Sequence, residues 1–275
     1  MTTIDKLDET ADTTTEADGQ SPVIEISDVW KLHKLGDEVV RALVAAELQV
    51  MPGEFVCLMG PSGSGKSTLL NIIGGLDRPT KGAVKLAGRD TSLLTESQFA
   101  ALRHDTIGFI FQSYNLIPFL SAVENVELPL MFEPYDRKSL RKRAVELLEL
   151  VGLGHRIHHQ PTKMSGGEQQ RTAIARSLIS SPTLVLADEP TANLDHRTGE
   201  TVVRMLRDLC STLGVTVVAS THDPTVADEA TRVVRMKDGQ IVNCPNGIGR
   251  AIHDARTRGS PADRARQAAD HRTGP

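Results

Sequence analysis

A glycine-rich octet followed by a helical pattern is the strongest chemical signal in this sequence. Glycines let a backbone turn its N–H groups inward around phosphate oxygens, and the N-terminus of a following helix adds positive potential. In such a loop Lys66 supplies a point charge for the β- and γ-phosphates, and Ser67 supplies a hydroxyl that can bind Mg²⁺. The octet is Gly60, Pro61, Ser62, Gly63, Ser64, Gly65, Lys66 and Ser67, and we expect Thr68 to join it in binding nucleotide.

The position of this octet favours a phosphate site over the alternative of a plain glycine turn that caps a helix. The apolar run Phe55–Leu58 directly precedes it, and helical spacing of apolar residues follows at Thr68–Ile73. A strand, a glycine-rich loop and a helix in this order are the context in which the pattern binds phosphate. We therefore expect a nucleotide here.

Two adjacent acids, Asp188 and Glu189, follow the apolar run Leu184–Ala187. Nucleotide hydrolysis needs a carboxylate at the end of a neighbouring buried strand to hold Mg²⁺, and a group that orients the attacking water. We assign the metal, through water, to Asp188 and the general base to Glu189. Alone, the two acids could be a surface pair, but together with the phosphate loop they predict nucleotide hydrolysis.

Other polar residues lie where strands end or helices begin. Ser165, Gly166 and Gly167 lead into a helical pattern from Glu168, and this arrangement can form a second anion-binding helix N-terminus. The same residues by themselves also make a good capping turn. Gln112 and His222 follow apolar runs, where ordinary polar residues are common.

The composition argues against several other classes of function. The 275 residues are 39% hydrophobic, enough for one folded unit with subdomains. No apolar run approaches the roughly 18 uncharged residues of a spanning helix, and the acidic N-terminus is unlike a signal peptide, so we expect a cytoplasmic chain. Cys57, Cys210 and Cys244 lack a CxxC pair, which favours reduced thiols. With a net charge of −4 and no long basic stripe, we expect no nucleic-acid partner.

The pattern of apolar runs indicates an α/β fold with a mainly parallel sheet. Short β-rich runs alternate with helical patterns, one of which is Gly199–Thr212, and several runs are apolar throughout, as in strands buried on both faces. Residues 113–180 read as an inserted helical subdomain, in which a helix after Asp136 buries one face. The predicted strands are Phe55–Leu58, Ile107–Phe111, Leu184–Ala187, Val215–Ser220 and Val233–Met236, and the buried helical face comprises Leu140, Ala144, Leu147, Leu148 and Val151.

Both ends of the chain have compositions that do not support a packed core. Residues 1–22 form an acidic arm, in which the first 21 residues hold six acids and one lysine, and we expect it to be disordered. Residues 246–275 carry six arginines against three aspartates and form a tail that we expect to be mobile. A weak contact of this tail with anionic lipid is the alternative to a solvated tail.

Taken together in sequence order, these motifs resemble those of the ATP-binding subunits of ABC transporters, over roughly residues 23–243. The segment Met164–Arg171 is similar to the signature of that family, LSGGQ followed by xQR. The resemblance implies a RecA-like P-loop core at 23–112 and 181–245 with an N-terminal antiparallel β portion, and the helical subdomain at 113–180. It also implies ATP and Mg²⁺ as cofactors.

The resemblance also assigns roles to single residues. Gln112 matches the Q-loop glutamine, which would sense Mg²⁺ and the transmembrane partner, and His222 matches the switch histidine, which would contact the γ-phosphate. Asp195 closes Asn193-Leu194-Asp195 like the D-loop. In this family two copies close head to tail over two MgATP. The signature residues Ser165, Gly166, Gly167 and Glu168 would then complete the site of the partner copy.

Three positions depart from the commoner family pattern. Glu168 stands where glutamine is usual, and Met164 stands where leucine is usual, a change that conserves volume. His33 aligns with an aromatic residue that often stacks on adenine. We weigh an adenine platform equally against an exposed histidine at a strand end, and Trp30 nearby could belong to the core.

A finer resemblance points to the macrolide-export and lipoprotein-release branch, through the stretches Ile107–Pro118 and Glu124–Leu130. Members of this branch work with a membrane permease that has few transmembrane helices and a large extracytoplasmic domain. Residues 113–130 would then dock the permease, which would hold this chain at the inner face of the membrane. The apolar residues of this segment could equally be core, and they are Leu116, Ile117, Phe119 and Leu120.

The resemblance leaves the cargo open. Export, lipoprotein release and transmembrane mechanical signalling all use the same motor. A soluble ABC ATPase in a non-transport assembly is the alternative from another class, but the apolar segment after Gln112 favours a membrane partner.

Overall fold

The computed structural model describes residues 21–36 and 38–243 of the chain. The predicted tail at 246–275, Cys244 and all of the predicted acidic arm except Ser21 and Pro22 lie outside these described residues. Cys57 and Cys210 are buried free thiols, as predicted.

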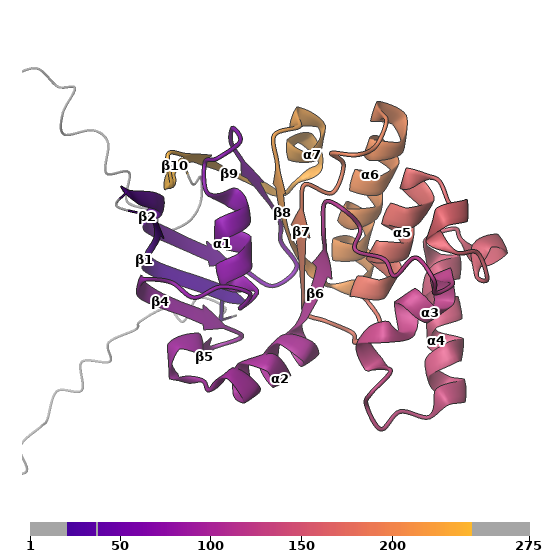
Figure 1. Cartoon of the computed structure of the whole chain (residues 1–275). Coiled ribbons are helices and arrows are strands. Elements are labelled where there is room, and N and C mark those ends of the chain that lie inside the picture. The colour runs from indigo at the N-terminus through magenta and orange to yellow at the C-terminus, as the bar shows by residue number, and fades with distance from the viewer. Residues whose placement is uncertain (1–20, 37, 244–275) are drawn as a thin grey trace, which may run out of the picture.

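The centre of the molecule is a six-stranded sheet with the strand order β10-β9-β3-β8-β7-β6 (Figure 1). The neighbouring strands from β9 to β6 are parallel, and β10 pairs with β9 in the antiparallel sense. All five predicted strands are present, with ends shifted by a residue at some positions. The strands are β3 Phe55–Met59, β6 Ile107–Ile110, β7 Leu184–Asp188, β8 Thr216–Thr221, β9 Arg232–Lys237 and β10 Gln240–Asn243.

A second sheet has the strand order β2-β1-β4-β5 and is wholly antiparallel. It confirms the predicted N-terminal β portion. Together the two sheets give the α/β fold that the resemblance implied. The strands of this sheet are β1 Ile24–Leu35, β2 Glu38–Val50, β4 Lys81–Leu86 and β5 Arg89–Asp90.

Helix α1 lies between the two sheets, and α3, α4 and α5 gather on the other side of the central sheet (Figure 1). Two helices begin earlier than predicted, because Gly65 and Asp195 act as their N-caps and include the next residues in the first turn. The helices are α1 Lys66–Ile73, α2 Glu96–Thr106, α3 Ala122–Glu127, α4 Arg137–Leu150, α5 Gly166–Ser177, α6 His196–Leu213 and α7 Pro224–Glu229.

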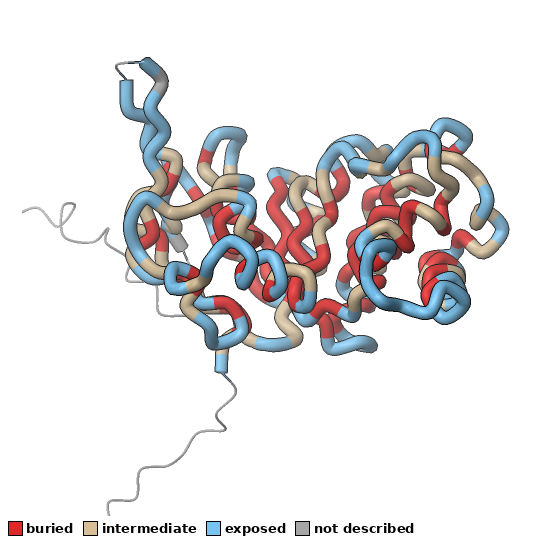
Figure 2. The backbone as a smooth tube through the Cα atoms, turned by 60° about the horizontal axis from the view of Figure 1, so that its bottom comes forward, coloured by how far each residue is buried: buried red, intermediate tan, exposed pale blue. Residues whose placement is uncertain are grey.

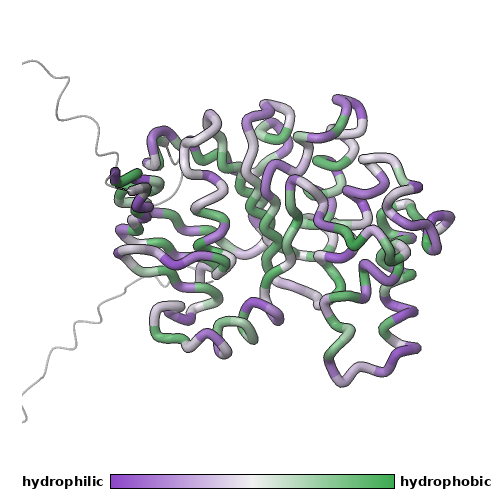
Figure 3. The backbone as a smooth tube through the Cα atoms, in the orientation of Figure 1, coloured by the Kyte–Doolittle hydropathy of each residue, from purple (hydrophilic) through white to green (hydrophobic). Residues whose placement is uncertain are grey.

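The central strands are buried on both faces, which explains why their sequences are apolar without alternation. In β3, Phe55 and Cys57 pack into a core with α3 to α6, whereas Val56 and Leu58 pack into a core with α1 and the antiparallel sheet. The central strands are accordingly buried and apolar along their length (Figures 2 and 3). The sheet thus holds the loops at its carboxyl edge on a rigid support.

Helix α4 begins after the N-cap Asp136, whose carboxylate accepts a hydrogen bond from the Ser139 N–H at 2.9 Å. Four of the five residues predicted for its inner face are buried, and Leu147 is partly buried against the same core. The predicted helical face is therefore confirmed.

No helix in the described part of the chain combines the length and the apolar character that crossing a membrane requires.

Candidate nucleotide site

The glycine-rich octet forms a tight loop between β3 and α1, and two of its glycines are required by close backbone contacts. A Cβ on Gly60 would lie 2.3 Å from the Met236 carbonyl oxygen. Gly65 has a φ of +98°, and a Cβ there would lie 2.5 Å from the Ala42 carbonyl oxygen. Only glycine fits both positions without moving the backbone. The loop is therefore held by contacts to β2 and β9 as well as by its own turns.

Lys66 is buried at the first position of α1, with its ammonium group turned back over the loop. Its Nζ donates to the carbonyl oxygens of Gly60 at 2.8 Å and Pro61 at 3.1 Å, and lies 3.6 Å from Oε1 of Glu189. The buried Ser64 hydroxyl has no hydrogen-bond partner among the described residues. A cation and a free donor thus line this loop, as a site for phosphate oxygens requires.

The hydroxyl of Ser67 and the carboxylate of Asp188 meet beside the loop. Ser67 Oγ donates to Asp188 Oδ1 at 2.9 Å, and Ser220 Oγ donates to the same oxygen at 2.5 Å. A hydroxyl and a carboxylate are oxygen ligands that Mg²⁺ accepts together with phosphate oxygens and water. Ser67 and Asp188, two of the three predicted metal residues, therefore fit Mg²⁺ bound with a nucleotide. Within residues 21–36 and 38–243, no group of three His, Cys, Asp or Glu side chains could hold a metal ion by itself.

Glu189 occupies the centre of the site in a strained backbone conformation. Its φ is +46°, a left-handed value that is rare for a residue with a side chain. The Glu189 N–H donates to two oxygens of Ser220, the carbonyl oxygen and the hydroxyl Oγ, each at 3.1 Å. One carboxylate oxygen, Oε1, lies 3.6 Å from Lys66 Nζ, and the other, Oε2, lies 3.0 Å from His222 Nδ1. The structure therefore brings together three of the four predicted catalytic residues.

Gln112, the fourth predicted catalytic residue, follows two positions after β6 rather than ending it, and its side chain is exposed. Because β6 is the parallel neighbour of β7, Gln112 lies at the same sheet edge as Asp188. The backbone of this segment is held from another loop, since Asn193 Nδ2 donates to the Gln112 carbonyl oxygen at 2.9 Å.

The signature segment caps a helix of its own. Ser165 is the N-cap of α5, its hydroxyl accepts the Glu168 N–H at 3.3 Å, and Glu168 Oε2 accepts the Ser165 N–H at 2.8 Å. The helix begins at Gly166, two residues before the predicted start, because this reciprocal cap includes both glycines in the first turn. Ser165 itself is exposed. The predicted capping turn is therefore present, and it leaves Ser165 at an exposed helix N-terminus.

Asp195 is the N-cap of α6 and accepts the Thr198 N–H at 3.1 Å. Hydrogen bonds from the side chain and the backbone of Thr198 hold the pKa of Asp195 below its usual value.

His33 lies on the exposed part of the β1–β2 hairpin, opposite Val40. Trp30 is half-buried, and its Nε1 donates to Asp28 at 2.7 Å.

Sequence reasoning missed two groups that hold this site. Ser220 connects Asp188 to Glu189, and the only sequence signal for it was a polar residue at the end of an apolar run. The contact of Asn193 with the Gln112 backbone joins two loops that lie 81 residues apart in the sequence, and no local pattern predicts such a contact.

The apolar segment after Gln112 is more exposed than a core segment would be. Phe119 is 84% exposed and Ile117 40% exposed, while Leu116 and Leu120 are half-buried. Next to this segment, a groove of about 540 Å³ runs where α2 and β6 meet the helical elements, and it is lined by Phe109, Phe111, Leu128 and Pro129 among others. The core alternative for these four apolar residues is therefore wrong for Phe119 and Ile117.

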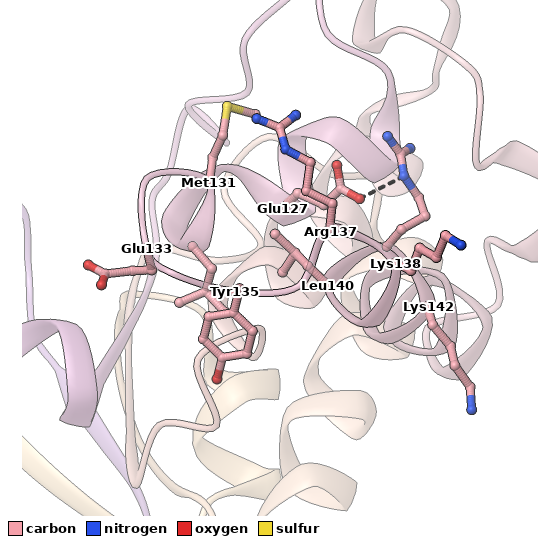
Figure 4. A pocket seen from close by; sticks show the side chains of 10 residues that line it. Glu127, Met131, Glu133, Tyr135, Arg137, Lys138, Leu140 and Lys142 are labelled. Carbon is pink, nitrogen blue, oxygen red and sulfur yellow. Dashed lines mark ion pairs between the residues drawn. The ribbon is translucent and has the colours of Figure 1, made fainter.

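A separate pocket of about 560 Å³ lies between the segment after α3 and the first turns of α4 (Figure 4). Its wall includes an ion pair between Arg141 and Glu127 at 2.7 Å, and Tyr135 and Met131 lie at its rim (Figure 4). Burial raises the pKa of Glu127. None of its lining residues belongs to the predicted nucleotide site, so this hollow is distinct from it.

Comparison with known proteins identifies the family. A model of the ABC transporter family matches residues 43–192, more than half of the chain, which include the phosphate loop, the signature segment and Glu189. The chain belongs to the ABC transporter family. An uncharacterized ABC transporter ATP-binding protein of Thermotoga maritima is 52% identical over 219 residues, which make up 80% of this chain and 93% of that protein.

Two further relatives of this ABC transporter subunit support the predicted branch. The macrolide export ATP-binding/permease protein MacB of Wolinella succinogenes is 48% identical over 238 residues, which make up 86% of this chain and 37% of that protein. The ATP-binding cassette MJ0796 of Methanocaldococcus jannaschii has been solved as a post-hydrolysis dimer bound to ADP and Pi. That structure has a TM-score of 0.75 and 46% identity, and the match covers 80% of this chain and 97% of that one. This ABC transporter subunit is an ATP-binding motor subunit and an ATPase.

Proposed function

We propose that two copies of this chain close head to tail over two MgATP, and that the closure moves a separate membrane permease. The observation that carries the proposal is the division of the site. The cradle of Lys66 contacts β2 and β9, whereas the exposed N-terminus of α5 at Ser165 belongs to the helical side of the molecule. Two half-sites that lie apart on one contact surface are both completed when a second copy is turned around a two-fold axis, because each half-site then meets the other half-site of the partner. MJ0796, a relative, has been solved as a dimer.

Each catalytic residue takes one role in the hydrolysis. Glu189 accepts a proton from the attacking water, whose oxygen bonds to the γ-phosphorus as the bond to the β–γ bridging oxygen breaks and ADP leaves. His222 orients the Glu189 carboxylate through the 3.0 Å contact. Lys66 and the partner's Ser165 end of α5 stabilise charge on the transferred group. Ser67, Asp188 and Gln112 would hold Mg²⁺, which when bound neutralises charge on the β- and γ-phosphates.

The exposed segment at 113–130 is the proposed docking surface for the permease. Phe119 and Ile117 are 84% and 40% exposed and lie next to a groove with apolar lining, and exposed apolar surface that gathers in this way marks an interaction site. The neighbouring groove is lined by residues of α2, β6 and α5, so a permease segment bound there would contact both the central sheet and the helical side. Through that permease we place the chain at the inner face of the membrane.

The class of permease is inferred from relatives. MacB proteins of several bacteria are 45–48% identical to this chain over their ATP-binding parts, and their names describe macrolide export. We propose a permease of that type, with an extracytoplasmic domain, acting in export, lipoprotein release or mechanical signalling. In the nucleotide site, we propose that the imidazole of His33 stacks on the adenine base.

A Glu189→Gln variant tests the motor. The change keeps the size of the side chain and removes the basic carboxylate, so turnover should fall by about 10²–10⁴-fold while MgATP binding survives. With MgATP, light scattering should then report a dimer that retains two nucleotides, and adding Ser165→Arg should prevent it. Near-normal turnover in Glu189→Gln would refute the role of Glu189 as the general base. In a separate experiment, affinity capture of this chain from detergent extracts would identify the permease that co-purifies with it.

A further inference from the structure

We propose that Arg156 is a positioning residue for the signature end of α5: it compensates the charge of Glu168, so that this helix N-terminus can receive the γ-phosphate of the ATP held by the partner copy. The inference rests on the proposed head-to-tail dimer and names a residue that none of the motifs contains.

Glu168 carries a negative charge at the N-terminus of α5. Its carboxylate caps α5, with Oε2 accepting the Ser165 N–H at 2.8 Å, and the side chain is only 14% exposed. Hydrogen bonds from the backbone and the side chain of Ser165, and after them the charge of Arg156, hold the pKa of Glu168 below its usual value. The residue is therefore an anion at neutral pH, in the first turn of a helix whose task is to attract another anion.

A capping box works equally well with glutamine, which makes the same hydrogen bond without a charge. The glutamate thus brings a negative charge that the cap does not need, and this charge lies beside the place where phosphate must bind. Like charges brought together at an interface weaken association unless a cation lies between or beside them. A compensating cation is therefore needed close to Glu168.

Arg156 is that cation. Its Nε lies 2.9 Å from Glu168 Oε1, the oxygen that the cap leaves free. Its Nη1 lies 3.1 Å from His159 Nε2, which holds the guanidinium from the other side. Arg156 ends the 3₁₀ turn Gly154–Arg156, and its N–H donates to the Leu153 carbonyl oxygen at 2.8 Å. The guanidinium is thus held from two sides beside the carboxylate. Because the two charges are opposite, Glu168 and Arg156 together carry no net charge.

The residues that directly follow this turn contact the proposed docking segment. The N–H groups of Ala122 and Val123, at the start of α3, donate to the carbonyl oxygens of His159 at 2.8 Å and Ile157 at 3.1 Å. The backbone that carries Arg156 is therefore hydrogen-bonded to the helix that follows Phe119. A partner that shifts this segment would shift Arg156 relative to Glu168.

A charge-removal series in the Glu189→Gln background tests the inference, with MgATP as the only ligand. Arg156→Gln should raise the MgATP concentration for half-maximal dimer formation by about tenfold, since it leaves an unpaired anion at the interface. MgATP binding to the monomer should not change, because the Lys66 cradle does not include this turn. Glu168→Gln added to Arg156→Gln should restore dimer formation to within about twofold of the parent, because the cap is kept and the charge is gone.

The control is Arg204→Gln, which removes an arginine paired with Glu200 and Glu229 on the surface of α6 and should change nothing. If Arg156 acts only by packing, Glu168→Gln will not rescue its loss, and the inference is overturned. It is equally overturned if Arg156→Gln dimerises like the parent. If the Glu189→Gln parent itself fails to dimerise, the proposed closure fails and the role of Arg156 falls with it.

Discussion

His222 Nδ1 lies 3.0 Å from Glu189 Oε2, while the other oxygen of the same carboxylate faces Lys66 at 3.6 Å. His222 is 67% exposed and Glu189 only 14% exposed, so the histidine connects solvent to a sheltered acid. Removal of the imidazole should leave MgATP binding intact and slow hydrolysis, because the carboxylate would lose the contact that orients it toward water.

We therefore expect His222→Ala to lower turnover by about 10²-fold with little change in MgATP affinity. Steady-state phosphate release and equilibrium binding measure the two quantities. His104→Ala is the matched control, since that histidine pairs with Asp105 and Glu133 away from the site. Loss of binding in parallel with turnover would show that His222 supports the fold and not the chemistry.

Lys66→Ala should abolish measurable MgATP binding by calorimetry, because the triphosphate loses its buried side-chain cation. The loop should still fold, since Gly60 and Gly65 are held by contacts with Met236 and Ala42. Lys142→Ala, on the exposed side of α4, should bind as the wild type does. Wild-type affinity in a folded Lys66→Ala protein would rule out the cradle.

Ser220→Ala should raise the Mg²⁺ concentration needed for half-maximal ATPase activity by about tenfold. The hydroxyl fixes Asp188 Oδ1 at 2.5 Å, and groups that orient a metal ligand typically contribute 10–100-fold to metal affinity. A Mg²⁺ titration at saturating ATP measures the shift, with Ser211→Ala on α6 as control. An unchanged titration would mean that Asp188 is held without this hydroxyl.

Phe119→Glu should prevent capture of the permease, because it puts a charge on the most exposed apolar side chain of the proposed docking segment. Circular dichroism and MgATP binding check that the variant is folded. Phe132→Glu, also on the surface at 89% exposure but outside the segment, is the matched control. Continued capture by Phe119→Glu and loss of capture by Phe132→Glu would move the docking surface from residues 113–130 to the surface around Phe132.

His33→Ala should weaken ATP and GTP binding alike if the imidazole stacks on the base, because stacking tolerates the identity of the base. His33→Tyr should restore or tighten it. Fluorescence titration with both nucleotides gives the comparison, and equal affinities for all three proteins would leave His33 an exposed hairpin residue.

The sequence predicted well those parts of the site that short, local patterns determine. The loop from Gly60 to Ser67 and the pair Asp188–Glu189 each follow an apolar strand, and their place at one sheet edge follows from parallel pairing. Helix starts were less predictable, because the caps at Gly65, Ser165 and Asp195 add residues before the apolar pattern begins.

Contacts between distant loops could not be predicted. The Asn193 side chain reaches Gln112, and Arg156 reaches Glu168, only after the helical elements have packed against the sheet. A single sequence holds no periodicity for such pairs, because their partners are chosen by tertiary packing. The exposure of Phe119 agrees with the docking interpretation, which came from the family resemblance, whereas the apolar pattern by itself left a core position equally open.

Gly167 belongs to the signature, yet its immediate neighbour is Thr198, whose Cγ2 would lie 2.4 Å from a Cβ added at that glycine. Thr198 is in the first turn of α6, the turn that Asp195 caps. Variation at Gly167 is thus limited by helix-to-helix distance before any nucleotide arrives. A side chain there would show itself as a lowered melting temperature in the nucleotide-free protein, so inactivity of a Gly167 variant is no measure of how closely ATP approaches this residue.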